Sequence, residues 1–525
     1  MKDDRTSSPP LPIDRRSFVR LSAFAAASAL AYGHSSLAAR AELLAPSGLH
    51  PDVASGGIAA TLTIQSTRVP NSVLLDPHFS SLSFEKDSIN RSPVYLSDAN
   101  TDLIGLLNAL GGGVLRIGAN SVDETTWTPD GTGQISGQVA PVDIANFAAM
   151  IRRCPLWKVI YGVNFDGKDG STASPALAAG EASYAAQQLG AQLLGFEIGN
   201  EPDLYGSGLT YDIFLNGGTL PDGTVVAGWN AFAQAIRSAV PHAVLTGPAA
   251  SSDKKGWAED FAPSETGNIA LLTEHYYISN YSSAAPSIPG MLAYPGPGIV
   301  SALQTLQTAA SANHLPFRID ECNTYFASKK PAGVANAFAA ALWAIDFIFT
   351  NAQYGSSGVN FHNTGNTSGY AAIGESDSVI ASVQPLYYGM FLFSKLFPLS
   401  LPGVLLESTL TVTGVALSAF AVALLDGTRV VLNNKDTASA ANVTISGFAP
   451  WTRTALITTL ASAGDTPADQ LANLGIYNGG GPITFGGEPV ALNGQWNGRP
   501  TEMPVSGASL TVAIQPATAA VIHFL

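Results

Sequence analysis

The carboxylic acids of Glu201 and Glu321 are the two side chains of this sequence best placed to do chemistry. Glu201 follows Asn200 directly after the apolar run 193–199, and Glu321 ends the run 317–321. A carboxylate that ends a buried strand lies at the rim of a sheet, where it can meet a substrate. Two carboxylic acids that flank one cavity can take separate roles in one reaction, since one donates a proton while the other attacks carbon. The pair therefore predicts an acid and a nucleophile at a common site.

Each glutamate also has a purely structural interpretation. The Asn-Glu-Pro tripeptide 200–202 is short enough to arise by chance at a turn. Arg318, three residues before Glu321, could hold that glutamate in an ion pair at the end of a strand. Only the joint placement of both carboxylates at one rim favours catalysis over these alternatives.

Eight apolar runs that alternate with helical segments would position the two glutamates. The expected strands are 78–85, 114–118, 157–165, 193–199, 244–247, 269–277, 317–321 and 358–362. The expected helices are 101–110, 174–189, 226–240, 299–313, 334–352 and 386–397. Eight βα units over residues 77–398 predict an α/β protein with a (β/α)8 TIM barrel. The alternative is an open doubly wound sheet, but no G-x-G-x-x-G follows the first expected strand.

The chain changes character after residue 402. Short strands separated by Gly, Asn and Pro turns are expected at 412–425, 429–433, 441–445, 453–460 and 510–524. This pattern predicts a β-sandwich over residues 399–525. Residues 58–76 alternate and are rich in Thr, Val and Ile, and we expect the strands of the region 42–76 to join that sandwich.

The first 41 residues have the layout of a twin-arginine export signal. Arg15-Arg16 precede the alanine-rich apolar run 21–32, and small residues follow at 38–41. The alternative is a membrane anchor, but the run is well below the roughly 20 residues that span a bilayer. We therefore expect export to the periplasm or the exterior, and no membrane span in the mature chain.

Composition argues against several classes of function. Hydrophobic residues make up 46% and charged residues 12% of the 525 residues, which suits a large folded core. The formal net charge of -14 and the lack of a basic block argue against a nucleic-acid partner. Two cysteines, Cys154 and Cys322, cannot make a disulfide framework, and we expect free thiols. The sequence has no H-E-x-x-H, G-x-S-x-G or G-x-x-x-x-G-K-[ST] motif, so we expect no metal and no cofactor.

The motifs resemble those of retaining glycosidases of clan A, and within it glycoside hydrolase family 79, the group of bacterial β-glucuronidases and heparanase. The resemblance covers most of residues 75–400. It rests on Asn200-Glu201, Glu321, His275-Tyr276-Tyr277, Asn360-Phe361-His362, Pro385-Leu386-Tyr387-Tyr388 and Lys395-Leu396. The resemblance implies that Glu201 is the acid/base and Glu321 the nucleophile of a two-step displacement. Glu201 must then start protonated, and Glu321 must be ionised.

The same resemblance assigns sugar-binding roles. It implies that Tyr276 donates a hydrogen bond to Glu321 and keeps its pKa low, and that Asn200 contacts the sugar 2-hydroxyl. Other residues implied to line the sugar pocket are Glu85, Asn120, Phe326, Gly369 and Tyr370, the last two of which would hold a glucuronate carboxylate. The chain departs from the family after Tyr325, where Phe326-Ala327-Ser328-Lys329-Lys330 replaces a glycine run. Lys329 either compensates as a cation or is a solvated loop lysine.

These assignments predict an exo-acting retaining β-glucuronidase with a carbohydrate substrate. A retaining mechanism predicts a carboxyl separation of about 5 to 5.5 Å, whereas a separation above about 6.5 Å indicates inversion. Two alternatives stay open. One is another clan A retaining glycosidase that acts on a neutral sugar, and the other is a non-catalytic carbohydrate-binding protein on a decayed barrel.

Overall fold

The structure is a computed structural model that describes residues 56–206, 208–252, 255–281, 284–326, 333–365 and 369–525. The predicted export signal at 1–41, the residues up to 55, and Lys329 lie outside these ranges. No helix in the described ranges has the length and apolar character needed to cross a bilayer.

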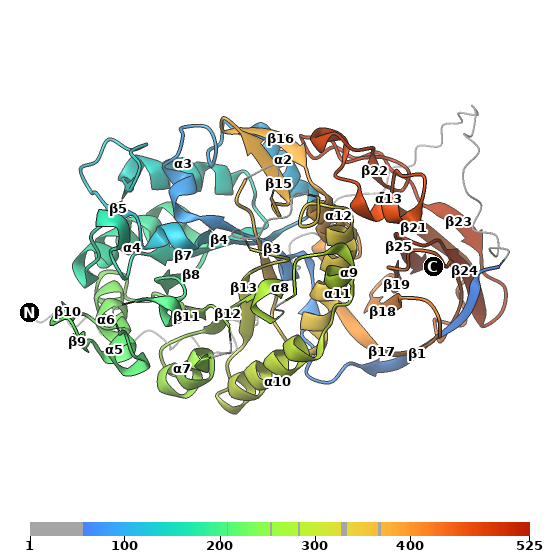
Figure 1. The fold of residues 1–525 in the computed structure, drawn as a ribbon, viewed down its shortest axis with the longest axis horizontal. Coiled ribbons are helices and arrows are strands. Elements are labelled where there is room, and N and C mark those ends of the chain that lie inside the picture. Colours follow the sequence, from blue (N-terminus) through green and yellow to red (C-terminus); the bar gives the residue numbers. More distant parts are fainter. Residues whose placement is uncertain (1–55, 207, 253–254, 282–283, 327–332, 366–368) are drawn as a thin grey trace, which may run out of the picture. The chain divides into compact units, whose positions relative to one another are not determined.

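Eight parallel strands close into a barrel, and helices surround it, which confirms the predicted fold class (Figure 1). The strands are β3 (Ser80–Glu85), β4 (Gly113–Gly118), β7 (Trp157–Val163), β8 (Leu193–Ile198), β11 (Leu245–Ala250), β12 (Leu271–Tyr277), β13 (Phe317–Asn323) and β14 (Val359–His362). The main helices are α2 (Thr101–Ala109), α3 (Pro141–Arg152), α4 (Pro175–Leu189), α6 (Trp229–Ala239), α7 (Trp257–Glu265), α10 (Pro297–Ala312), α11 (Ala339–Gln353) and α12 (Pro385–Ser394). Helices α3 and α7 were not predicted, and α11 begins at Ala339 rather than at 334.

The barrel strands are buried on both faces, because side chains fill the barrel interior and helices cover its outside. All seven residues of β12 are buried. Its side chains still alternate: His275 and Tyr277 meet glutamates of the interior, while Tyr276 packs its ring against Phe347 of α11 at 5.0 Å between centroids. This alternation decides which tyrosine reaches the candidate site.

One eleven-stranded sheet forms the carboxy-terminal β domain. Its longer strands are β1 (Ile58–Arg68), β17 (Gly403–Thr411), β18 (Leu417–Leu424), β19 (Gly427–Asn434), β20 (Ala441–Ser446), β21 (Thr454–Ser462), β24 (Ser509–Ile514) and β25 (Thr518–Phe524). The sheet folds over one core that takes residues from both of its halves, among them Leu62, Val443 and Val512 from one half and Val430, Ile457 and Ile522 from the other.

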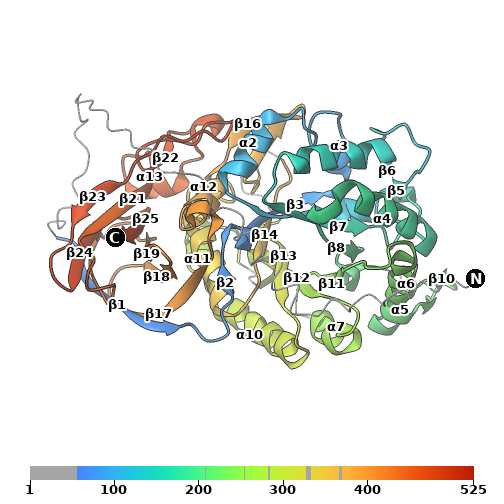
Figure 2. The same ribbon diagram turned by 180° about the vertical axis from the view of Figure 1, so that it is seen from behind.

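Strand β1 lies inside this sheet although it comes from the opposite end of the chain. It pairs with β17 on one side and with β20 on the other. Figure 2 shows β1 alongside β17, with strands of the β domain beyond. The first described strand therefore depends on the last part of the chain for both of its partners.

A buried carboxylate joins the barrel to the β domain. Asp346 of α11 accepts hydrogen bonds from Ser418 at 2.5 Å and Asn433 at 2.9 Å, and lies 2.5 Å from the Nζ of Lys435. Beside it, the ring of Phe349 stacks on that of Phe420 with 4.3 Å between centroids. Since Asp346 is 2% exposed, its partners are needed to offset the loss of water.

Candidate active site

Glu321 enters the barrel interior through an irregularity in β13. The register between β12 and β13 shifts so that Glu274 faces Ile319 while His275 faces Glu321. Asp320 is thus an extra residue, as in a β-bulge, and both Asp320 and Glu321 approach the same buried guanidinium. The bulge places two consecutive carboxyl groups inside the barrel, where a regular strand would place one.

Hydrogen-bond donors hold both oxygens of the Glu321 carboxylate. Arg116 donates to Oε2 at 2.7 Å and the hydroxyl of Tyr277 donates to Oε1 at 2.8 Å. Burial would raise the pKa of Glu321, but electrostatic interactions with His362, His275 and Arg116 and the Tyr277 hydrogen bond lower it to about 2. Glu321 is therefore ionised at any ordinary pH.

Glu201 occupies a turn that few side chains can adopt. Its φ is +49°, in the left-handed region, and Gly199 two residues earlier has a φ of +76°. A side chain at Gly199 would collide with its neighbours, since a Cβ there would lie 2.7 Å from the Tyr205 hydroxyl and 2.9 Å from Phe165. The constrained backbone turns Asn200 and Glu201 toward the barrel mouth.

His275 connects the two glutamates. Its Nδ1 lies 3.0 Å from Oε1 of Glu201. One oxygen of Glu201, one oxygen of Glu321 and a nitrogen of His275 all lie within 4.8 Å of one another. Three such groups could in principle hold a cation, but both oxygens of Glu321 already accept hydrogen bonds, which suits an acid-base site better.

Arg116 organises the floor of the site. It is fully buried and lies 2.6 Å from Glu197, 2.7 Å from Glu321 and 3.6 Å from Asp320. Its guanidinium also donates to the side-chain oxygen of Asn200 at 2.9 Å. Burial and the charge of Glu197 raise the pKa of Asp320 well above its ordinary value, whereas the pKa values of Glu197 and Glu321 are lowered, so Asp320 is the acid of this group that takes up a proton at the highest pH.

Glu85 and His362 form the side of the site next to β3 and β14. Ser121 donates to Glu85 from its backbone N–H at 2.9 Å and its hydroxyl at 2.7 Å. His362 lies 3.4 Å from Glu85 and 3.9 Å from Glu321. Burial works against a charged His362, but the two carboxylates raise its pKa. Burial likewise disfavours the Glu85 carboxylate, but His362 and Ser121 bring its pKa below the ordinary value.

The prediction that Tyr276 orients Glu321 is wrong, because Tyr277 makes that hydrogen bond. Neighbouring residues of a strand point to opposite sides, and the Tyr276 ring packs outside the barrel against Tyr294 and Phe347. The prediction therefore failed by a single position. Arg318, the alternative partner of Glu321, instead donates to Asn360 at 2.5 Å.

The other sequence-predicted residues are placed as follows. Asn200 donates to Asn120 at 3.2 Å, and Phe326 and Tyr370 pack their rings near Tyr277 at 5.8 and 5.9 Å between centroids. Gly369, beside Tyr370, is buried. Lys329 lies outside the described residues, so its role as a cation stays a prediction. Cys154 and Cys322 are buried free thiols.

Sequence reasoning missed three groups of the site, namely Arg116, Glu197 and Asp320, and named His275 and His362 only as motif residues without a role. One signal was available, since Arg116 is a lone charge within the apolar run 114–118 and needs a buried partner. Nothing local indicates which acid that partner is. Asp320 could not be placed without knowing about the bulge.

Comparisons with known proteins agree with this architecture. No protein-family model matches the chain. A β-glucuronidase of Neurospora crassa is 31% identical over 154 residues, which is 27% of this chain and 26% of that protein. The chain thus aligns with about a quarter of the length of that curated relative.

Two solved structures share the fold over nearly the whole chain. The 4-O-α-L-rhamnosyl-β-D-glucuronidase of Fusarium oxysporum 12S matches with a TM-score of 0.68 and 18% identity, over 88% of this chain and all of that one. The GH51 arabinofuranosidase of Xanthomonas axonopodis pv. citri matches with a TM-score of 0.61 and 14% identity, over 89% of this chain and all of that one. At these identities the likeness establishes the fold, a (β/α)8 barrel of the kind that glycosidases use.

Proposed function

We propose that this protein is a retaining glycoside hydrolase in which Glu201 is the acid/base and Glu321 the nucleophile. The observation that carries the proposal is the approach of the two carboxylates, which have oxygens within 4.8 Å of each other. Retaining enzymes need a short separation of about 5 to 5.5 Å, whereas inverting enzymes need room for a water between the carboxyl groups. The different surroundings of the two glutamates also suit the two roles.

The reaction proceeds in two displacements. In the first, an oxygen of Glu321 forms a bond to the anomeric carbon, the bond to the leaving oxygen breaks, and that oxygen takes the proton of Glu201. In the second, Glu201 takes a proton from water, the water oxygen attacks the anomeric carbon, and Glu321 departs as a carboxylate. Tyr277 and Arg116 hold Glu321 for in-line attack, and His275 holds Glu201.

We propose a β-glucuronide as the substrate. Support comes from the names of two similar proteins, both glucuronidases, and from the clustering of Tyr277 and Tyr370 beside Glu321. A neutral sugar is the second candidate, and one observation favours it. Glu85 is an anionic carboxylate at the site and would repel a sugar carboxylate on its side while accepting hydrogen bonds from hydroxyls.

A substrate panel tests both proposals. We would measure kcat/KM for the 4-methylumbelliferyl β-glucuronide, β-glucoside, β-galactoside and β-xyloside and the α-arabinofuranoside. The expected result is turnover of the glucuronide. The β-anomer of the free sugar should be released first, as monitored by NMR. Turnover of neutral sugars alone would contradict the glucuronide proposal, and first release of the α-anomer from a β-glycoside would contradict retention.

A further inference from the structure

The backbone turn 199–201, which carries Glu201, is held by hydrogen bonds from each of its three N–H groups. The N–H groups of Gly199 and Glu201 donate to the backbone oxygens of Val163 in β7, at 3.0 Å, and Ala249 in β11, at 2.9 Å. The N–H of the middle residue, Asn200, donates to side chains instead. A residue with a positive φ, such as Glu201, keeps that conformation only where its surroundings enforce it. The acceptors of these three bonds therefore determine where the Glu201 side chain lies.

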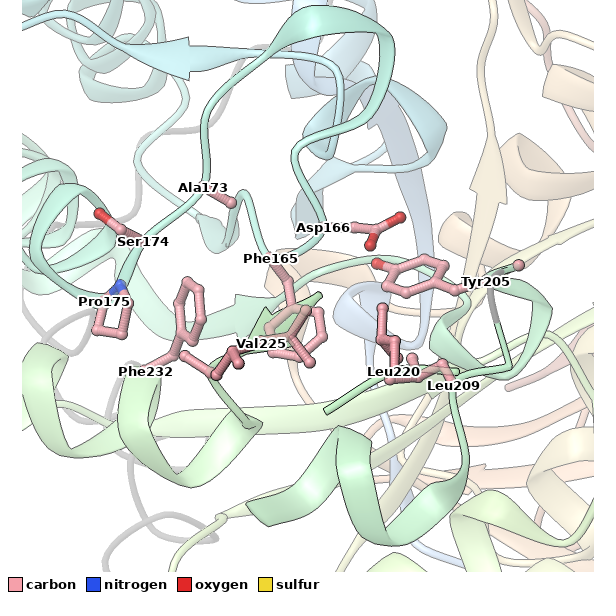
Figure 3. A pocket seen from close by; sticks show the side chains of 13 residues that line it. Phe165, Asp166, Ala173, Ser174, Pro175, Tyr205, Leu209, Leu220, Val225 and Phe232 are labelled. Carbon is pink, nitrogen blue, oxygen red and sulfur yellow. The ribbon is translucent and has the colours of Figure 1, made fainter. Parts of the chain in front are cut away.

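Two buried side chains share the Asn200 N–H. The Tyr205 hydroxyl accepts from it at 3.0 Å, and one oxygen of the Asp123 carboxylate accepts from it at 3.3 Å. The Tyr205 hydroxyl in turn donates to that same oxygen of Asp123. Figure 3 shows the Tyr205 ring beside that of Phe165, with its hydroxyl directed toward the chain at Phe165 and Asp166. Asp123 and Tyr205 thus form one hydrogen-bonded unit under the turn.

The other oxygen of Asp123 is fixed by a second loop. It accepts hydrogen bonds from the backbone N–H groups of Phe165 at 3.0 Å and Asp166 at 3.3 Å, which follow β7. Asp123 itself follows β4, and Tyr205 follows β8. One fully buried carboxylate therefore ties together the loops after three barrel strands. A carboxylate with this many donors is a rigid anchor for the Asn200 N–H.

The Glu201 carboxyl depends strongly on its backbone for orientation. Among the residues that the structure describes, His275 is the hydrogen-bonding partner of that carboxyl, at 3.0 Å. The side chain of Asn200, by contrast, has anchors of its own, since it accepts from Arg116 at 2.9 Å and donates to Asn120 at 3.2 Å. Loosening the backbone turn should therefore displace the Glu201 carboxyl more than the Asn200 side chain.

We propose that Asp123 and Tyr205 are positioning residues that hold Glu201 in place for proton transfer to the leaving group. This inference rests on the proposed function. The pair acts through the backbone N–H of Asn200. Proton transfer needs the acid within hydrogen-bond reach of the leaving oxygen, so a small displacement of the turn lowers the rate. The loss should appear only with leaving groups that need a proton.

Tyr205→Phe tests the proposal by removing the hydroxyl and keeping the ring. For the sugar that the enzyme accepts, kcat/KM of the phenyl glycoside should fall about tenfold. That of the 2,4-dinitrophenyl glycoside should stay within about twofold, because this leaving group departs without a proton. Asp123→Asn should show the same selectivity and a larger loss, because it also disturbs the bonds from Phe165 and Asp166.

Tyr161→Phe is the matched control. Tyr161 of β7 is fully buried, and its hydroxyl donates to the carboxylate of Glu181 in α4 at 2.9 Å. The control therefore loses the same kind of bond to a buried carboxylate without touching the turn. Thermal melting should show a similar loss of stability in Tyr161→Phe and Tyr205→Phe, but the control should keep the wild-type ratio of phenyl to dinitrophenyl kcat/KM.

Hydrogen exchange at the Asn200 amide, followed by mass spectrometry of the unliganded protein, tests the turn without turnover. Tyr205→Phe should speed this exchange at least about fivefold, and Tyr161→Phe should leave it unchanged. Equal losses with both leaving groups, or an unchanged exchange rate at Asn200, would overturn the inference. Should the wild type hydrolyse no glycoside, the proposed function fails, whereas the exchange rate still decides whether Tyr205 holds the turn.

Discussion

The two candidate catalytic glutamates lie in very different surroundings. Arg116 and Tyr277 fix both oxygens of Glu321, whose side chain is 8% exposed. In the described part of the chain, His275 is the hydrogen-bonding partner of the Glu201 carboxylate, and that side chain is 18% exposed. A nucleophile must stay ionised and keep a fixed orientation, whereas an acid/base must exchange a proton twice in each cycle. The barrel therefore immobilises the Glu321 carboxylate and leaves the Glu201 carboxylate open to proton exchange.

Replacing Glu321 should have the largest effect. Glu321→Gly removes the attacking oxygen, so we expect kcat to fall at least about 10⁴-fold with every substrate, whatever its leaving group. Azide should restore part of the turnover and yield a glycosyl azide of inverted configuration, identified by NMR. Glu407→Gly, in strand β17 of the β domain, serves as the control and should keep full activity. Unchanged activity of Glu321→Gly would remove this residue from the mechanism.

Replacing Glu201 should have a large effect that depends on the leaving group. Glu201→Ala removes the proton donor, so kcat/KM should fall about 10²- to 10⁴-fold for phenyl glycosides and far less for 2,4-dinitrophenyl glycosides, which need no protonation. The measurement is kcat/KM across a series of substituted phenyl glycosides. Equal losses across the series would mean that Glu201 is not the acid and would erase the contrast with Glu321.

The two neighbouring tyrosines offer a sharper comparison. Tyr277→Phe removes one charge-assisted hydrogen bond to Glu321, which should lower kcat/KM about 10- to 100-fold. The loss should also raise the pKa of Glu321 from about 2. Because the nucleophile acts only when ionised, the acid limb of the pH profile should move to higher pH. Tyr276→Phe should leave kcat/KM within about threefold and the acid limb in place, since its ring packs outside the barrel.

Two buried acids behind the nucleophile should give the smallest catalytic effect and a contrast in stability. Glu197→Gln leaves the Arg116 guanidinium without its closest counter-charge, which should cost about 3–5 kcal/mol of unfolding free energy in urea. Asp320→Asn puts a neutral amide of similar shape in place of an acid whose raised pKa favours the neutral form, so it should cost under about 1 kcal/mol and leave kcat/KM within about threefold. A large loss in Asp320→Asn would show that Asp320 is charged.

The barrel was predictable because its signals are local. Eight apolar runs separated by helical segments give the strand count, and a strand end gives the place of Glu201. Strand β17 and helix α3 were still missed, although Pro141 and the apolar spacing of Ile144, Phe147 and Ile151 do indicate a helix. The sequence pattern therefore predicted the eight barrel strands more completely than the helices and the start of the β domain.

The details of the site were not predictable because they depend on which face of its strand each residue occupies and on partners that are distant in sequence. In β12 every side chain is buried, so no polar alternation reveals whether Tyr276 or Tyr277 faces inward. The bulge at Asp320 arises from the pairing of β13 with both of its neighbours. The acid partners of Arg116 come from two other strands, β8 and β13, and no single segment of the sequence records that pairing.

The position of β1 has a consequence for the order in which this protein can be made. A ribosome synthesises β1 first among the described strands, yet β17 and β20, its partners, emerge only after the whole barrel. Until then β1 presents two unpaired edges, which are liable to pair with other chains. The barrel can thus fold during synthesis while its β domain must wait, and limited proteolysis of chains stalled before Gly403 should find the β1 segment accessible to cleavage.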